Sequence, residues 1–308
     1  MSAWPEFLSD PNMRWILSGC MLLGLGSGVI GSFAYLRKQS LMGDALSHAA
    51  LPGVCIAFLI TGTKSLLGFL IGAAAAGVLA TLAIHGLSRY TRIKPDSAIA
   101  AVLSVFFGLG IVLLTDIQHG GSGNQSGLDK FLFGQAATMV MSDVYAMMAV
   151  SALLIGLCTL LFKEFKLVSF DPAFARGLGF PSALLDQLLM LLIVVAVVVG
   201  IQAVGVVLMA ALLITPAVSA RYWTERLSVM VVLSGAFGAV SGIVGTLASA
   251  QVAGLPTGPA AVLCATAVFV LSLLFGPRKG FVAQAVVRGR AKRAVAAEAR
   301  YGRKEEAL

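Results

Sequence analysis

Charged side chains are scarce in this sequence. Only 12% of the 308 residues are Asp, Glu, Lys or Arg, whereas 58% are hydrophobic, and the mean hydropathy is +0.94. An ordinary soluble domain carries about 25% charged residues, so the composition excludes that class. The sequence predicts an all-α, multi-pass membrane protein in which transmembrane helices and short connections make up nearly the whole chain.

Three further features are missing. The four cysteines lie in separate apolar runs without paired spacing, which predicts small core residues rather than disulfides or metal ligands. The first seven residues are acidic where a cleavable signal peptide is basic, so we expect the first apolar run to be retained as a span. The stretch Thr61–Ser65 lacks the adjacent glycine and lysine of a phosphate-binding loop. The chain is therefore predicted not to be an ATPase itself.

Apolar runs long enough to cross a bilayer recur along the chain. A span needs about 20 residues, and the stretch 185–223 is too long for one crossing, so we divide it between Gly200 and Gly205. The result is nine predicted helices, or eight if that stretch or the glycine-rich first pair is divided differently. The predicted spans are 15–36, 42–62, 65–86, 97–115, 139–162, 185–203, 205–223, 228–249 and 257–276.

Lys and Arg fall almost entirely on one side of these spans. With the N-terminus outside, 19 of the 22 basic residues lie in inside segments, and only Arg14, Lys64 and Lys130 lie outside. Cytoplasmic segments are enriched in Lys and Arg, so we expect an outside N-terminus and an inside C-terminus. The chain then divides into an external segment 1–14, a transmembrane domain 15–276 and a basic cytoplasmic tail 277–308.

The tail 277–308 carries nine Lys or Arg residues and three Glu residues. A basic segment next to a membrane is attracted to anionic lipid headgroups. Binding to nucleic acid would need a folded reader or an aromatic platform, and the tail shows neither pattern. We expect contact with lipid, or plain solubility, and no nucleic-acid partner.

Small residues form ridges along several spans, namely Gly24–Gly28, Gly72–Gly77 and Gly238–Gly242. Such ridges let helix backbones approach closely in lipid, and they predict packing rather than a particular function. Pro216 lies deep in a predicted span. It either interrupts that helix or only bends it.

Asp44 and His48 are an ionisable pair in a long apolar run, whereas the other acidic residues fit connections, tails or span ends. Residues four apart share one helix face, with about 6 Å of axial rise between them. Such a pair in hydrocarbon is a functional candidate, and carboxylate with imidazole suits Mn²⁺, Zn²⁺ or Fe²⁺. Alternatively, Asp44 caps the start of the helix. Asp116 with His119 is a weaker candidate for helping a cation approach.

The longest inside connection, 163–184, contains a second pattern. Asp171 followed by Pro172 predicts an N-cap and the first residue of a short helix that ends at Gly177 or Gly179. Phe170 and Phe174 are four residues apart, so they share one apolar face, and Arg176 adds positive charge. We expect a short amphipathic helix along the cytoplasmic face, with a re-entrant loop as the alternative.

Three stretches resemble the membrane permease of bacterial ABC importers for manganese, zinc or iron, and the resemblance extends from about Trp15 to Pro277. The matching stretches are Ser40-Leu-Met-Gly-Asp-Ala-Leu-Ser-His-Ala-Ala-Leu-Pro-Gly53, Phe170-Asp-Pro-Ala-Phe-Ala-Arg-Gly-Leu-Gly179 and Ala211-Leu-Leu-Ile-Thr-Pro-Ala-Val-Ser-Ala220.

This resemblance implies a type II ABC importer-like fold in the bacterial inner membrane. It implies a second permease protomer, identical or paralogous, two ATP-binding subunits inside and a metal-binding protein outside. Asp44 and His48 of both protomers would form a transient site for the transported Mn, Zn or Fe ion, with Mn favoured. The resemblance also identifies the coupling helix that seats in the ATPase, formed by Phe170, Asp171, Phe174, Arg176 and Gly179.

Two other interpretations remain open at this point. A secondary transporter or channel for divalent cations would share the spans and the Asp44–His48 pair. It would need neither the Phe170–Gly179 element nor an ATPase partner. A structural membrane protein would need no ionisable pair inside the membrane. Co-purification with a separate ATPase discriminates the importer from both alternatives.

Overall fold

The computed structural model describes residues 11–62, 66–119, 141–251 and 255–285, and within these ranges it contains helices and no strand. The labelling positions 125 and 300, which would test the predicted topology from the two sides, lie outside these ranges. The helices, in chain order, are α2 (Pro11–Leu36), α3 (Ser40–Thr61), α4 (Leu66–Tyr90), α5 (Pro95–His119), α7 (Met141–Leu160), α8 (Phe162–Phe170), α9 (Pro172–Gly177), α10 (Ser182–Val204), α11 (Val206–Arg221), α12 (Leu227–Gln251) and α13 (Thr257–Phe275).

In the described part of the chain, eight helices are long and apolar enough to cross a membrane, and α11 is a shorter apolar helix. The expected division of the stretch 185–223 is confirmed, because α10 ends and α11 begins on either side of Gly205. Gly205 has φ +87°, a left-handed conformation that glycine adopts without steric cost. Pro216 lies inside α11, which continues through it. The helical stretch is therefore divided at Gly205, and Pro216 does not interrupt α11.

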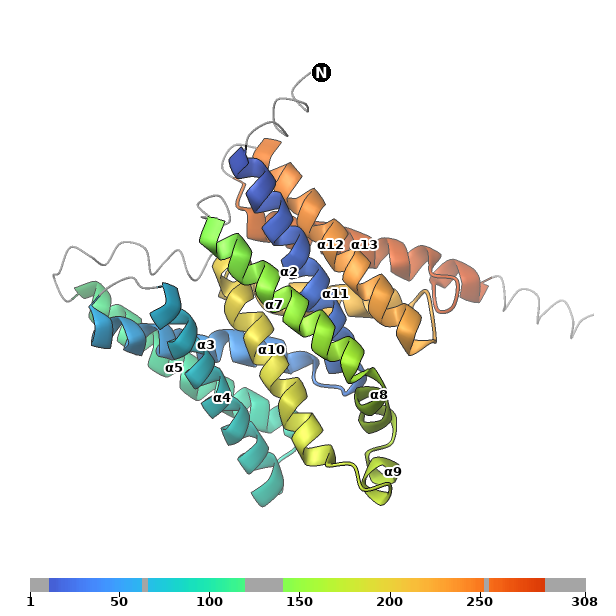
Figure 1. Cartoon of the computed structure of the whole chain (residues 1–308), viewed down its shortest axis with the longest axis horizontal. Helices are drawn as coiled ribbons and strands as arrows, with labels where there is room; N and C mark the ends of the chain where they lie inside the picture. Colours follow the sequence, from blue (N-terminus) through green and yellow to red (C-terminus); the bar gives the residue numbers. More distant parts are fainter. Residues whose placement is uncertain (1–10, 63–65, 120–140, 252–254, 286–308) are drawn as a thin grey trace, which may run out of the picture.

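Helix α2 lies at the centre of one group of helices and packs against α7, α10, α11 and α12 (Figure 1). The glycine ridges of α2 and α12 face each other, so that a Cβ added at Gly24 would collide with the carbonyl of Gly238. The Ser234 hydroxyl donates a hydrogen bond to the Gly28 carbonyl across this seam, at 2.6 Å. Close backbone approach and interhelical hydrogen bonds hold helices together in lipid. The predicted packing role of these ridges is confirmed.

Helices α3, α4 and α5 form a second group, drawn at the lower left in Figure 1. Gly53 of α3 and Gly72 of α4 meet backbone to backbone, because a Cβ on either residue would collide with the carbonyl of the other. Helices α10 and α11 each contact α2 on one side and α3 on the other. These two helices therefore join the two groups, and α3 is packed on several sides along most of its length.

Helices α8 and α9 lie together at one end of the bundle, next to the start of α10 (Figure 1). The ring of Phe33 on α2 packs against Phe162 and Phe165 of α8, with centroids 6.1 and 5.6 Å apart. The Asp171 carboxylate accepts a hydrogen bond from the Phe174 backbone N–H at 2.9 Å, and Pro172 begins α9. The predicted N-cap and short helix are thus confirmed.

Candidate functional site

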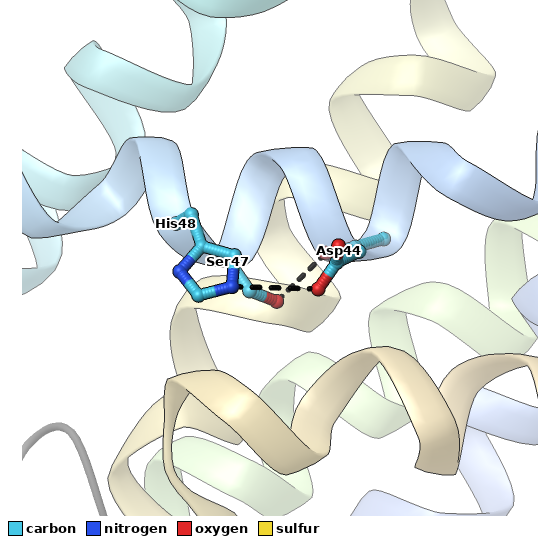
Figure 2. A network of polar contacts seen from close by, with 4 residues as sticks. Asp44, Ser47 and His48 are labelled. Carbon is cyan, nitrogen blue, oxygen red and sulfur yellow. Dashed lines mark hydrogen bonds and ion pairs between the residues drawn. The ribbon is translucent and has the colours of Figure 1, made fainter. Parts of the chain in front are cut away.

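Asp44 and His48 project from the same side of α3 on consecutive turns (Figure 2). The Nε2 atom of His48 lies 3.5 Å from the Oδ1 atom of Asp44. A full charge-assisted hydrogen bond spans about 2.7–2.9 Å, so the Nε2 nitrogen and the Oδ1 oxygen are not closely bonded to each other. A usual metal–ligand distance is about 2.1 Å. For an ion at that distance from both atoms, the 3.5 Å separation corresponds to an angle of about 110° between the two metal–ligand bonds. The pair already has the spacing of two neighbouring metal ligands.

Asp44 does not cap α3, which contradicts the alternative considered from the sequence. The helix begins at Ser40 with Gln39 as its N-cap, and Asp44 lies in the second helical turn. The early start follows from a tight connection to α2. There Lys38 has φ +58°, and the Gln39 N–H donates to the Ala34 carbonyl at 3.0 Å. The carboxylate is therefore left free of the capping role.

The two side chains differ in how firmly the fold holds them. The Asp44 side chain is 45% exposed, whereas that of His48 is only 17% exposed. The Phe107 ring of α5 packs edge-on against the imidazole, with centroids 4.7 Å apart and planes at 71°. Ser47 lies between Asp44 and His48 in the sequence. Its hydroxyl donates a hydrogen bond to the Gly43 carbonyl of the same helix, at 2.7 Å (Figure 2). The arrangement is one oriented imidazole beside one accessible carboxylate.

Sequence reasoning missed the contact between Phe107 and His48. The two residues lie on different helices, and Phe107 is one of several aromatic residues in apolar runs. The Nδ1 atom of His48 is buried and has no hydrogen-bond partner among the described residues. No polar pattern in the sequence could have revealed an aromatic support of this kind.

The other candidates are not gathered into a second site. His119 ends α5, and its Nδ1 atom contacts the Thr115 carbonyl of its own helix at 2.8 Å. Asp116 and His85 are exposed. All four cysteines are free, and Cys20, Cys55 and Cys158 are buried in the core, as predicted. The described ranges contain no group of three or more His, Cys, Asp or Glu that could hold a metal. Within the described ranges, the Asp44–His48 site therefore offers two candidate ligands.

The segment Phe170–Gly179 exposes apolar side chains, but the expectation that Phe170 and Phe174 share one face of a single helix is wrong. Phe170 ends α8, and the extended backbone of Asp171 separates it from α9. Phe170 and Phe174 are 61% and 56% exposed, and Leu178, four residues further on, is also exposed. Ala175, the residue after Phe174 in α9, is buried. The Arg176 Nε atom donates to the Pro172 carbonyl at 3.2 Å and so lies along the helix. Exposed apolar side chains and the exposed Arg176 therefore lie on this segment at the end of the bundle.

Residues 9–276 match the ABC 3 transport family. The chain belongs to this family. It is 55% identical over 297 residues to the manganese transport system membrane protein MntC of Bacillus subtilis, covering 96% of this chain and 68% of the relative. It is 49% identical over 285 residues to the zinc transport system membrane protein TroC of Treponema pallidum, covering 92% and 95%. The solved structure of PsaBC from Streptococcus pneumoniae in complex with Fab aligns with a TM-score of 0.78 at 33% identity, covering 90% and 97%.

Membership of the ABC 3 family confirms the resemblance drawn from the three matching stretches. Together with eight long apolar helices in the described ranges, it identifies the chain as a multi-pass cell-membrane protein and a permease subunit of an ABC transporter. The roles of Asp44, His48 and the Phe170–Gly179 segment within that permease stay predictions.

Proposed function

We propose that this ABC 3 permease forms the membrane pathway of an ATP-driven importer for a divalent transition-metal ion, with Mn²⁺ the favoured cargo. The observation that carries the proposal is the Asp44–His48 pair, two ligand side chains 3.5 Å apart on a membrane-spanning helix. Of the two relatives described above, the more similar is named for manganese and the other for zinc. Mixed oxygen and nitrogen ligands suit both ions.

A second permease protomer, identical or paralogous, completes the site in this proposal. One protomer supplies one carboxylate and one imidazole, which leaves a divalent ion with half its charge unbalanced and too few ligands. Two protomers around a two-fold axis would supply four ligands and two negative charges. Desolvating a divalent ion is costly inside a membrane, so matching its charge there lowers the barrier to passage. The 45% exposure of Asp44 leaves it accessible to the ion and to the partner.

The site serves transfer rather than storage, because an importer has to release its cargo. Asp44 reaches the ion from an exposed position, and the 3.5 Å spacing to His48 needs little rearrangement for binding or release. We therefore propose a transient site whose affinity depends on the conformation of the transporter. The metal reaches it from a separate metal-binding protein on the outer face.

In each protomer the Phe170–Gly179 segment forms the docking surface for one ATP-binding subunit, so that the dimer binds two such subunits, which carry out the hydrolysis. Asp171 fixes the start of α9 through its bond to the Phe174 N–H, and Gly179, with φ +84°, allows the chain to turn towards α10. Phe170 and Phe174 supply apolar contact and Arg176 supplies charge. This segment is the feature that favours an ABC importer over a secondary transporter or channel.

Transport of radioactive ⁵⁴Mn by the reconstituted complex tests this function. The permease, its ATPase and its metal-binding protein are placed in liposomes with ATP on the ATPase side. Uptake should require ATP, and Asp44→Ala should reduce it to background. Glu225→Gln, which removes an exposed carboxylate from the connection between α11 and α12, is the matched control and should transport normally. ATP-independent uptake would instead establish the secondary transporter or channel.

The proposed orientation, with the N-terminus outside and the α9 end in the cytoplasm, has its own test. Thr61 ends α3 and precedes the start of α4, whereas Arg92 follows the end of α4, so α4 separates the two residues. Both are exposed. A membrane-impermeant maleimide applied to intact cells should label Thr61→Cys and leave Arg92→Cys unlabelled until the cells are opened. The reverse pattern would invert the topology.

A further inference from the structure

Arg37 and Asp186 form an ion pair at the end of the bundle that carries α9. The Arg37 Nη1 atom contacts the Asp186 Oδ1 atom, and the two side chains are 11% and 32% exposed. Arg37 lies in the short connection between α2 and α3, and Asp186 lies near the start of α10. A largely buried ion pair adds little net stability over apolar packing, because both charges lose their hydration. Its presence at this position therefore calls for a role other than stability.

On one side the ion pair is tied closely to the helix that carries the metal ligands. Only residues 37–39 separate α2 from α3, and this connection is closed by backbone hydrogen bonds from Lys38 to Tyr35 and from Gln39 to Ala34, each at 3.0 Å. Asp44 follows Gln39 by five residues in a continuous helix. A displacement of Arg37 is therefore passed directly to the first turns of α3.

On the other side the ion pair is tied to the docking helix. The turn from α9 to α10 is closed by hydrogen bonds from the Phe180 N–H to the Ala175 carbonyl and from the Leu185 N–H to the Pro181 carbonyl, at 3.0 and 3.1 Å. Ala175 is fully buried, which fixes α9 against its surroundings. Asp186 directly follows this turn, so it moves with α9 when that helix is displaced.

A cavity of about 480 Å³ borders the pair. It is lined by Met42 of α3, His85 of α4, Asp96 of α5 and Gln187 of α10, as well as by Arg37 and Asp186. Side chains do not fill the space between the start of α3 and its neighbours there. The first turns of α3 therefore have room to shift, and the ion pair is a direct contact across the edge of that space.

We propose that the Arg37–Asp186 pair transmits movement of the docking helix α9 to the metal-ligand helix α3. Both residues are positioning residues, since neither touches the ion. The inference rests on the proposed docking of an ATPase at α9 and on the proposed metal site at Asp44 and His48. It adds the physical connection between them, which runs from α9 through the start of α10 and the ion pair to α3.

The test uses the complete complex of permease, ATPase and metal-binding protein in liposomes. It measures basal ATP hydrolysis, its stimulation by the Mn-loaded binding protein, and ⁵⁴Mn transported per ATP. The neutral double variant Arg37→Gln/Asp186→Asn leaves no buried charge without a partner, so it should fold and assemble with normal basal hydrolysis. We expect its stimulation and its Mn-to-ATP ratio to fall at least fivefold. Gln187→Ala, which alters the same cavity on α10, is the control and should remain coupled.

Charge reversal separates transmission from simple stabilisation. Arg37→Asp or Asp186→Arg alone should be uncoupled, and the double reversal Arg37→Asp/Asp186→Arg should recover at least half of the coupling. Full coupling in the neutral double variant would overturn the proposal, as would an equal loss of basal and stimulated hydrolysis in that variant. If the wild-type complex itself shows no ATP-dependent ⁵⁴Mn transport, the proposed function fails, whatever these variants do.

Discussion

Two carboxylates near the same end of α3 have different partners. Asp186 faces the guanidinium of Arg37, which carries a permanent positive charge, and both side chains are largely buried. Asp44 faces the imidazole of His48 at 3.5 Å and is the more exposed member of its pair. The charge of Asp186 is therefore balanced within the protein, whereas the charge of Asp44 is available to a cation. The charge of the partner, rather than the carboxylate itself, distinguishes the ion-paired Asp186 from Asp44, the proposed metal ligand.

Neutralising each carboxylate in turn is the strongest test of whether Asp44 and Asp186 have different roles. Asp44→Asn should abolish Mn²⁺ uptake and lower metal affinity more than about 100-fold, since loss of a supporting residue alone costs 10–100-fold at metal sites. Its melting temperature in detergent should stay near the wild-type value, because the side chain is partly exposed and caps no helix. Metal analysis and thermal unfolding of the purified complex measure both quantities.

Asp186→Asn should lower the melting temperature and leave metal affinity nearly unchanged. It leaves the Arg37 guanidinium largely buried without its counter-ion, which should lower the melting temperature by about 3 °C or more. Metal affinity should change less than threefold, or about 0.7 kcal/mol in binding free energy. If both variants lost metal binding equally, the distinction between the two carboxylates would be wrong.

A change at α9 should disrupt coupling to the ATPase, in which Asp186 is proposed to act, while leaving metal binding at Asp44 unchanged. Phe174→Asp places a charge among the exposed apolar side chains of the Phe170–Gly179 segment, and we expect it to abolish transport and uncouple the ATPase. The purified permease should still fold and bind Mn²⁺ with unchanged affinity, because α9 lies outside the metal site. Transport, ATP hydrolysis and metal binding by the same preparation distinguish these effects. Persistent transport-linked hydrolysis would remove α9 from the coupling role.

Much of the fold could be predicted because its signals are local. Length and apolarity mark the long helices, Gly205 marks the division between α10 and α11, and Asp171 followed by Pro172 marks the start of α9. The predicted span starts at 42, whereas α3 starts at Ser40, since nothing in its composition signals the tight turn at Lys38. That misplacement kept capping open as a role for Asp44.

Contacts between distant residues could not be predicted in this way. Arg37 and Asp186 are far apart in the sequence, and each is a common residue type at the end of a span. The contact between His48 and Phe107 likewise depends on how α3 and α5 pack. The sequence singled out Asp44 and His48, the proposed ligands of the candidate site, through their rarity in an apolar chain. The residues that orient and connect them became visible only in three dimensions.

Removing the imidazole sharpens the comparison by separating ligand number from charge. His48→Ala takes away a ligand while Asp44 retains its negative charge, so we expect metal affinity to fall by about 10–100-fold, less than for Asp44→Asn. Uptake should be restored at high external Mn²⁺, which cannot rescue Asp44→Asn. Concentration-dependent ⁵⁴Mn uptake gives this result directly. A larger defect for His48→Ala than for Asp44→Asn would make the imidazole, and not the carboxylate, the dominant ligand.

The smallest expected effect concerns the support of His48. Phe107→Leu keeps an apolar side chain on α5 but removes the edge-on ring contact with the imidazole, whose centroid lies 4.7 Å away. Aromatic pairs of this kind contribute about 0.5–1.5 kcal/mol beyond burial, so a less oriented imidazole should weaken Mn²⁺ binding about two- to tenfold. The effect should vanish when His48 is already Ala, because Phe107 then has no ligand to orient. Phe106→Leu, a change of the same size at the neighbouring position of α5, is the control. If Phe107→Leu weakens binding equally with and without His48, the ring serves helix packing, and the orientation of His48 has another source.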